Sequence, residues 1–521
     1  MKLIRRRRLI KIIYKWCIVT LLLFCTISCQ QEVKECLEDC QVGNSLARLP
    51  VVGLEQKQQI PILVKAKSAG NVRIEYRKID AKVSQFSESE KLVEENDYTV
   101  NLNLNDIASG QKYQYRVEFS QENYSPWYQF NSFPKAGVPG KFSFVFSACL
   151  REKYLDYDIF SQIKSISPTF VALTGDQMYG DYDGNINKLE SYLSNDKLRQ
   201  EMISKGEKVL DDKNILDAFR SKYNRVFGSS YQNLTTNIPM MAMWDDHDFG
   251  EDNSDGTYPY KQQARQAFVE NFPANPYEDD NAGLYYSFSV ADVDVLVLDT
   301  RWYRSPMQNE DNQNKLMLGK KQLAWLLENL KKSTSKIKIV FSSVPLNDYG
   351  GDTSSNRPGY DSWVGYQHER SQVLSFIETN NIEGVLFFSG DQHYPSAHIL
   401  NKKSSLQPII QNSKYVEYKL ADLGTSVLDF SASPLSYKKA SGRKFELKNQ
   451  SDPNFAYELF RPDWAHPKEN KSHDAPIVVG SVYGLAEIDT STSPATTSVT
   501  FYELNAEKLV MEEIYRIKIN L

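Results

Sequence analysis

The chain has 521 residues, which is too long for one small domain and predicts two or three structural units. Hydrophobic residues make up 41% and charged residues 24%, as in ordinary globular proteins, so a disordered chain is excluded. The net charge of −5 offers no basic surface to neutralise a phosphodiester backbone, so we expect no nucleic-acid binding.

Residues 1–29 are predicted to be a signal peptide. A strongly basic stretch, MKLIRRRRLIKIIYK, precedes an apolar core, WCIVTLLLF, that is too short for a membrane-spanning helix. The following TISC resembles a bacterial lipobox, with Thr26 where Leu is usual, so we expect Cys29 to carry a lipid. The alternative is a plain secretory signal in which Cys29 is incidental. The arginine run also loosely matches a twin-arginine signal, which leaves the export route open.

Residues 30–45 read as a polar tether between the lipid anchor and the folded body. Cys36 and Cys40 within it could pair in an oxidising compartment or stay reduced. Cys149 is then the only cysteine of the folded body. A lone cysteine is most often an inert buried residue, but its position at a strand end favours a ligand.

Residues 46–133 are predicted to form an all-β domain. Alternating strands are expected at 60–67, 71–79, 98–107 and 112–120. Leu104 followed by SGQKYQYRV resembles the leucine and tyrosine pattern of a fibronectin type III-like sandwich, with a tyrosine packed at a corner. The segment PKAGVPG, 134–140, is a Pro- and Gly-rich hinge.

From residue 141 to 521, strand and helix patterns alternate, which predicts an α/β fold with helices on the sheet faces. Strands are expected at 142–148, 168–176, 238–246, 284–301 (a hairpin), 336–346, 383–393, 415–424, 477–489, 495–504 and 510–520. Helices are expected at 156–166, 214–228, 259–273, 320–333 and 368–380.

Chemically active side chains gather where these apolar strands stop. The blocks are FSACL with Cys149, GDQMYGD with Asp176 and Tyr179, WDDHDFG with Asp245, Asp246 and His247, and GDQHY with Asp391 and His393. Side chains at the carboxyl ends of neighbouring strands converge in space. A set of carboxylate, imidazole, thiolate and phenolate groups can hold more than one metal ion, so the sequence predicts a metallohydrolase.

Each block also has a plainer interpretation. A Gly-Asp pair at a strand end is often only a turn, and Asp245 and Asp246 could be a helix N-cap or part of a solvated loop. Asp176 is nevertheless well placed to bridge two cations, and Tyr179 can reach the same centre. A phenolate ligand favours a hard trivalent ion such as Fe(III).

Taken together, the blocks resemble the calcineurin-like metallophosphoesterases, and more closely the alkaline phosphatase D (PhoD-like) family. The shared blocks are Ser147 to Cys149, GDxxY, WDDH, LDTR, SWVGYxxxR (Ser362 to Arg370) and GDxH. The resemblance implies a metallophosphoesterase β-sandwich flanked by helices over 141–521, behind the fibronectin type III-like sandwich. Two departures, Leu150 for Gln and Asp248 for Glu, touch neighbours of the presumed ligands and put substrate preference in doubt.

The resemblance also implies roles for the site residues. Cys149, Asp176 and Tyr179 would ligate Fe(III), while Asp246, Asp391 and His393 would complete the site and bind Ca²⁺ or another divalent ion.

The resemblance leaves alternative roles open for three further residues. His247 would be catalytic, as a donor to the leaving oxygen or to the transition state. Asp245 would be a ligand or would orient one. Arg301 would either grip the phosphate bidentately or form a buried ion pair with Asp299 or another acid.

The function that follows is an exported metal-dependent phosphoric ester hydrolase, an alkaline phosphatase D-like enzyme acting on a small phosphate ester through a metal-activated hydroxide. We expect it in the bacterial cell envelope, associated with a membrane through Cys29. The alternatives are a dedicated phosphodiesterase or phospholipase-type hydrolase on the same scaffold, and a catalytically silent surface lipoprotein that binds a partner.

The lipid anchor is directly testable. Intact-mass analysis or labelling with a fatty-acid analogue should find acyl chains on Cys29, because a diacylglyceryl group plus a further chain supplies the multiple chains that stable anchoring needs. Cys29→Ser should abolish the label. A mature protein that begins at another residue would rule out the anchor, though not export.

Overall fold

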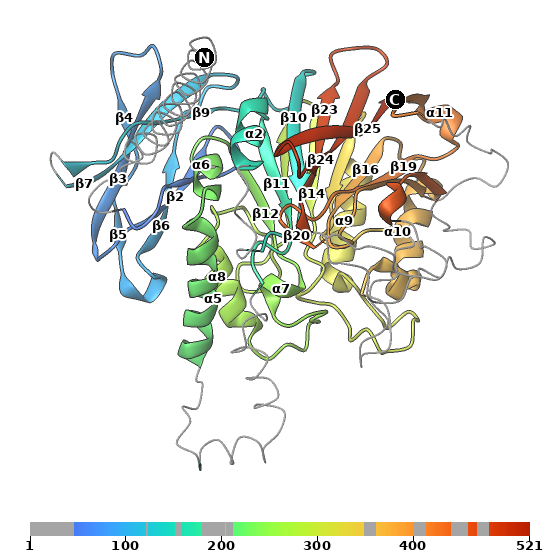
Figure 1. The fold of residues 1–521 in the computed structure, drawn as a ribbon, viewed down its shortest axis with the longest axis horizontal. Helices are drawn as coiled ribbons and strands as arrows, with labels where there is room; N and C mark the ends of the chain where they lie inside the picture. The colour runs from blue at the N-terminus through green and yellow to red at the C-terminus, as the bar shows by residue number, and fades with distance from the viewer. Residues whose placement is uncertain are drawn as a thin grey trace, which may run out of the picture.

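The computed structural model describes residues 46–120, 123–151, 159–179, 204, 212–347, 361–400, 413–438, 457–465 and 479–521. The predicted signal peptide and tether lie outside these ranges. Two seven-stranded sheets stand at the centre of the molecule, with helices on their outer faces and a separate β-sandwich on one side (Figure 1). Within the described ranges, no helix is both long enough and apolar enough to cross a bilayer.

The two central sheets mix parallel and antiparallel strands. The first runs, in spatial order, β12 (Met240–Met243), β11 (Phe170–Thr174), β10 (Lys141–Ser147), β23 (Val482–Asp489), β24 (Thr496–Asn505), β25 (Val510–Asn520) and β18 (Tyr415–Lys419). The second runs β13 (Tyr286–Val290), β14 (Val293–Val297), β15 (Lys338–Phe341), β16 (Val385–Ser389), β19 (Val427–Ser431), β17 (Ser396–Leu400) and β21 (Tyr457–Phe460). A short pair joins β20 (Tyr437–Lys438) to β22 (Val479–Gly480).

The sheets pack face to face because their inner faces are rich in phenylalanine. The ring of Phe144 meets that of Phe388 edge-on, with centroids 5.0 Å apart, and Phe146 meets the same ring at 4.9 Å. Edge-to-face packing of this kind adds to the free energy gained by burying the rings. Both β10 and β16 are therefore held rigidly at the middle of the molecule.

Helices cover both outer faces. The first sheet is covered by α2 (Ile159–Ile166), α5 (Asp212–Phe227), α6 (Tyr231–Thr235) and α8 (Lys261–Val269), and the second by α9 (Gly319–Lys332) and α10 (Gln367–Thr379). In α9 the buried side chains recur every four residues, at Gln322, Leu326 and Leu330, as expected of an amphipathic helix. Short helical segments are η1 (Glu94–Asn96), α7 (Asp246–Phe249), η3 (Trp363–Tyr366), α11 (Leu420–Leu423) and η4 (Asp463–Ala465).

The N-terminal region is a β-sandwich, as predicted. One sheet contains β1 (Val51–Val52), β2 (Ile60–Lys65) and β6 (Thr99–Leu104); the other contains β3 (Gly70–Lys78), β4 (Gln85–Phe86), β5 (Glu90–Leu92), β7 (Lys112–Ser120), β8 (Asn123–Tyr124) and β9 (Tyr128–Asn131). The corner tyrosine is Tyr113, whose buried hydroxyl accepts a hydrogen bond of 2.9 Å from the backbone N–H of Ala108.

One predicted strand is only half a strand. Residues 415–424 were expected to be extended, but β18 ends at Lys419 and the chain turns into α11. Gly424 ends that turn in the left-handed conformation, with φ 63°. Short strand and helix patterns are hard to separate by periodicity alone, and the apolar residues Leu420 and Leu423 fit both.

Candidate metal centre

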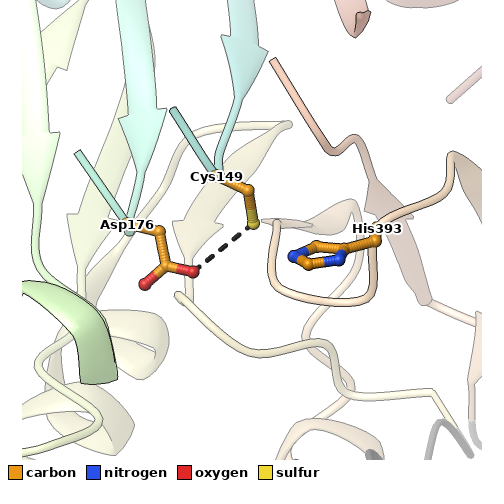
Figure 2. A group of neighbouring side chains, drawn as sticks. All are labelled: Cys149, Asp176 and His393. Atoms are coloured by element: carbon orange, nitrogen blue, oxygen red, sulfur yellow. Dashed lines mark hydrogen bonds between the residues drawn. The ribbon is translucent and has the colours of Figure 1, made fainter. Parts of the chain in front are cut away.

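The predicted ligands converge at one end of the two central sheets. Cys149 follows β10, Asp176 follows β11 and His393 follows β16, and their ligand atoms all lie within 4.8 Å of one another. Figure 2 shows Cys149 and His393 facing Asp176 from the ends of different strands. The ligand atoms of Asp176, Asp246 and His247 form a second group, again within 4.8 Å of one another. Asp176 belongs to both groups, which is the geometry that a bridging carboxylate requires.

Tyr179 lies inside this cluster. Its phenol oxygen is 3.5 Å from Nε2 of His393, and its ring stacks on that of His247 with centroids 4.2 Å apart. The ring of Tyr179 also lies against that of Tyr437, with centroids 4.6 Å apart. An aromatic wall of His247, Tyr179 and Tyr437 therefore borders the group of predicted ligands.

The backbone is strained where these ligands are presented. Cys149, Asp176, Asp391 and His393 all have φ between 52° and 61°, in the left-handed region. Such a conformation in a residue other than glycine costs on the order of 1–3 kcal/mol and persists only where the surroundings enforce it. Strain repeated at four neighbouring positions points to a functional site.

Two glycines allow the ligand loops to approach closely. A Cβ atom on Gly390 would lie 2.2 Å from Cβ of Ala148, and one on Gly175 would lie 2.5 Å from Cβ of Asp245. Gly175 also has φ 112°. The glycine of each Gly-Asp pair therefore allows two strand ends to pack closely, in addition to any role in a turn.

Asp248 connects two of the loops. Its buried carboxylate accepts backbone N–H bonds from Gln177 at 3.0 Å and from Asp245 at 3.1 Å, and a bond from the Tyr223 hydroxyl at 3.1 Å. From the sequence, Asp248 was expected to be only a neighbour of the ligands. The structure gives it a structural role, because it fixes the spacing of GDQMY and WDDH.

Arg301 is engaged in buried ion pairs. Its Nε donates to Asp245 Oδ1 at 2.6 Å, and Nη1 and Nη2 donate to the two oxygens of Asp361 at 2.9 and 2.8 Å. The guanidinium is fully buried. Of the two roles open for Arg301, the structure supports the ion pair over the phosphate grip, and the partners are Asp245 and Asp361. Asp299 instead accepts backbone N–H bonds from Arg301, Trp302 and Leu284.

Asp245 is accordingly held in place by several contacts. Besides Arg301, its Oδ1 accepts a bond of 2.6 Å from the Ser343 hydroxyl, and the residue is the N-cap of α7. The N-cap interpretation and the site interpretation of WDDH are thus compatible. Its second oxygen, Oδ2, faces no hydrogen-bond partner in the described part of the chain.

A polar network supports the loop that carries Asp391 and His393. Asn347 donates to Asp429 Oδ2 at 3.0 Å and to Gln392 Oε1 at 3.3 Å. Gln392 in turn donates to the carbonyl of Tyr394 at 3.0 Å. These buried contacts are the surroundings that hold the left-handed backbone in this loop.

Burial disfavours the ionised forms of the acidic side chains in the site when no cation balances their charge. Burial, together with the nearby carboxylate of Asp176, raises the pKa of the Cys149 thiol well above its ordinary value. Burial and Asp246 raise the pKa of Asp176, and burial and Asp361 raise that of Asp391. At Asp246 burial acts in the same direction, but His247 and Arg301 outweigh it and lower the pKa.

The donor set fits metal ions. Several buried carboxylate oxygens have no hydrogen-bond partner within the described ranges, namely Asp176 Oδ1, Asp245 Oδ2, Asp246 Oδ1 and Asp391 Oδ2. Unpaired buried carboxylate oxygens are costly unless a cation compensates them. The thiol, imidazoles and phenol beside them are groups that bind transition metals.

Some residues of the site were missed by the sequence analysis. They are Tyr437, Asp361, Ser343, Asn347, Asp429 and Asp248. Tyr437 lies on a two-residue strand and Asp361 follows no apolar strand, so neither had a sequence signal. Ser343 does follow a strand, β15, and the rule that flagged Cys149 could have found it.

Comparisons with known proteins agree with this geometry. Residues 144–473 match the family described as PhoD-like phosphatase. The chain is 26% identical over 325 residues to alkaline phosphatase D of Bacillus subtilis (strain 168), covering 57% of this chain and 53% of that protein. The match thus spans about half the length of that relative.

Two solved structures share the fold. One is described as the structure of PhoD, with a TM-score of 0.67 and 18% identity, covering 91% of this chain and 92% of that one. The other is purple acid phosphatase PPD1 from yellow lupin (Lupinus luteus) seeds, with a TM-score of 0.56 and 10% identity, covering 92% and 75%. The predicted metallophosphoesterase-like α/β fold is confirmed.

The close approach at Gly390 yields a stability prediction. Gly390→Ala should lower the free energy of unfolding by about 1–3 kcal/mol, because the added methyl group overlaps Ala148. It should also reduce metal binding, since the GDQH loop must shift. Gly70→Ala is the matched control, because nothing lies within 4 Å of its added methyl group. Chemical denaturation of both variants measures the difference, and equal stabilities would contradict the packing argument.

Proposed function

This chain belongs to the PhoD-like phosphatase family, and we propose that it is an exported, metal-dependent phosphoric ester hydrolase. The observation that carries the proposal is the pair of buried ligand groups that have Asp176 in common, in which several carboxylate oxygens lack a hydrogen-bond partner among the described residues. The family matched over 144–473 and the name of the Bacillus relative support phosphate esters as substrates.

The family implies metal ions, and we propose two positions for them. We assign Cys149, Asp176 and Tyr179, with His393 beside them, to an Fe(III) site. Asp176, Asp246 and Asp391 are assigned to Ca²⁺ or another divalent ion, with Asp245 as a ligand or an orienting group. When bound, such cations polarise phosphoryl oxygens and lower the pKa of a water molecule toward neutrality.

His247 is proposed to supply a proton to the leaving oxygen. Its ring is held against Tyr179, with centroids 4.2 Å apart, and its Nε2 lies 3.8 Å from Asp252 Oδ1. The geometry also allows a ligand role, because His247 lies in one group with Asp176 and Asp246. If His247 is a ligand, removing its imidazole should lower the metal content. If it is only a proton donor, the protein should keep most of its metal.

Arg301 acts on the reaction through Asp245. Its guanidinium holds that carboxylate in one orientation and, through Asp361, links it to the segment just before η3. We therefore replace the predicted phosphate grip of Arg301 with a positioning role. The other oxygen of this carboxylate, Oδ2, has no hydrogen-bond partner among the described residues.

Turnover of chromogenic esters tests the function directly. The metal-loaded full chain should hydrolyse p-nitrophenyl phosphate, and comparison with bis(p-nitrophenyl) phosphate separates a monoesterase from a dedicated phosphodiesterase. Failure to hydrolyse either ester would contradict the proposal and favour a silent binding lipoprotein. Export to the cell envelope with a lipid on Cys29 remains part of the proposal and rests on the sequence of residues 1–29.

The metal assignment predicts a coloured protein. Charge transfer from Tyr179 or Cys149 to Fe(III) should give a visible absorption band, and elemental analysis should find iron. Tyr179→Phe should shift or remove the band. Calcium chelation should lower activity while the band remains. A colourless, fully active protein that contains only zinc would defeat the Fe(III) assignment.

The role of His247 predicts a specific kinetic pattern. His247→Asn should keep the fold and most of the metal, while turnover falls by roughly two to four orders of magnitude, the usual effect of losing an acid–base group. The loss should be smaller for esters with very good leaving groups, which need little protonation.

The control for this variant is His368→Asn, at an exposed histidine on α10. It should have wild-type turnover. If His247→Asn loses metal in proportion to activity, His247 is a ligand. If its activity is unchanged, the WDDHD block has only a structural role.

A further inference from the structure

We propose that Tyr223 is a positioning residue for the metal centre, and that the N-terminal sandwich sets its place by holding α5. This inference rests on the proposed function, because it concerns the cations assigned to that centre. Tyr223 lies in none of the blocks that carry the predicted ligands. Its contacts nevertheless connect α5 to the spacing of two ligand loops.

Tyr223 anchors Asp248 to a helix outside the ligand loops. Its hydroxyl donates to Asp248 Oδ1 at 3.1 Å. The same carboxylate accepts backbone N–H bonds from Gln177 and Asp245, which lie in the GDQMY and WDDH loops. The two loops are thus joined to each other by Asp248 and to α5 by Tyr223. Loss of a residue that orients ligands from outside typically weakens metal binding 10- to 100-fold.

The ring of Tyr223 is held by the core. It is fully buried and meets the rings of Phe268 and Phe272 edge-on, with centroids 6.4 and 5.5 Å apart. Close packing of this kind leaves the ring little freedom to move. The position of the hydroxyl therefore follows the position of α5.

The N-terminal sandwich contacts the same face of α5, which lies between the sandwich and the central sheets (Figure 1). Arg220, Tyr223 and Asn224 are spaced i, i+3 and i+4, so they share one face of the helix. Arg220 donates to the carbonyl of Glu95 at 2.6 Å, and Asn224 accepts a bond of 2.9 Å from Lys65 Nζ on β2. The sandwich therefore fixes the helix one residue and three residues away from Tyr223.

The competing explanation is that Tyr223 only fills the core and satisfies a buried acid. Loss of its hydroxyl would then lower the stability of the fold and leave the affinity for cations unchanged. A positioning role predicts weaker cation binding, because the two loops are less firmly held. Tyr231 is the matched control. It is a fully buried tyrosine of the same core, and its hydroxyl contacts Met240 Sδ at 3.6 Å instead of a carboxylate.

Calorimetric titration of the full chain with Ca²⁺, after a chelator has removed bound calcium, separates the two explanations. Tyr223→Phe keeps the ring and should weaken Ca²⁺ binding about 10-fold, the lower end of the effect of a residue that orients ligands. Tyr231→Phe should bind Ca²⁺ as the wild type does. Turnover of p-nitrophenyl phosphate by Tyr223→Phe should fall at limiting Ca²⁺ and recover at saturating Ca²⁺, with KM for the ester unchanged.

A second variant tests the part played by the sandwich. Asn224→Ala removes a contact at an exposed position of α5, and Lys65 keeps its ion pair with Asp97. It should weaken Ca²⁺ binding roughly 2- to 5-fold, since one hydrogen bond contributes little more than that. Ser221→Ala, at an exposed position of the same helix, should have no effect. Asn224→Ala should add little in the Tyr223→Phe background, because both act through one hydroxyl.

Unchanged Ca²⁺ affinity in Tyr223→Phe would overturn the inference, and so would an equal loss in Tyr231→Phe. Unchanged affinity in Asn224→Ala would refute the role of the sandwich. A wild-type chain that binds no Ca²⁺ would contradict both the inference and the calcium assignment. A wild-type chain that binds Ca²⁺ but hydrolyses neither chromogenic ester would contradict the proposed function, while the effect of Tyr223 on Ca²⁺ binding could still be measured.

Discussion

The concentration of carboxylates in one buried volume is the constraint on which the rest of this structure depends. Asp176, Asp245, Asp246 and Asp248 are each no more than 4% exposed, and Asp391 joins them from the opposite sheet. Like charges at such spacing cannot all remain ionised without compensation, which is why burial and neighbouring carboxylates raise the pKa of Asp176 and Asp391. Part of this charge is met by the protein itself, and several carboxylate oxygens have no hydrogen-bond partner among the described residues.

Different donors of the protein compensate the charge of different carboxylates. Asp248 is satisfied by backbone N–H groups and the Tyr223 hydroxyl, and Asp245 and Asp361 share the guanidinium of Arg301. These contacts fix the loops, so the carboxylates that remain are presented in one geometry. A preorganised set of ligands needs little rearrangement when a cation or a substrate binds. Asp248 therefore fixes the spacing of the GDQMY and WDDH loops.

Presentation of the ligands has a cost in backbone strain. Parallel strands of both sheets end at the same edge, so Cys149, Asp176, Asp391 and His393 meet there only if the chain turns sharply after each strand. The left-handed turns are held by the packing of Gly390 on Ala148 and by the Asn347, Gln392 and Asp429 network. The phenylalanine interface between the sheets supplies the rigidity that keeps both strand ends in register.

The α/β class, the N-terminal sandwich and the candidate ligands could be predicted from the sequence, because strand patterns and strand-end residues are local features. Cys149, Asp176, Tyr179, Asp246, His247 and His393 could all be found this way. The contacts of Arg301 depend on the tertiary fold, since nothing in LDTR reveals that Asp245 and Asp361, 56 and 60 residues away, lie against its guanidinium. Tyr437, Asn347 and Asp429 were likewise invisible, because their contacts join segments far apart in the chain. A local pattern shows which side chain stands at a strand end, whereas its partners depend on which strands the fold brings together.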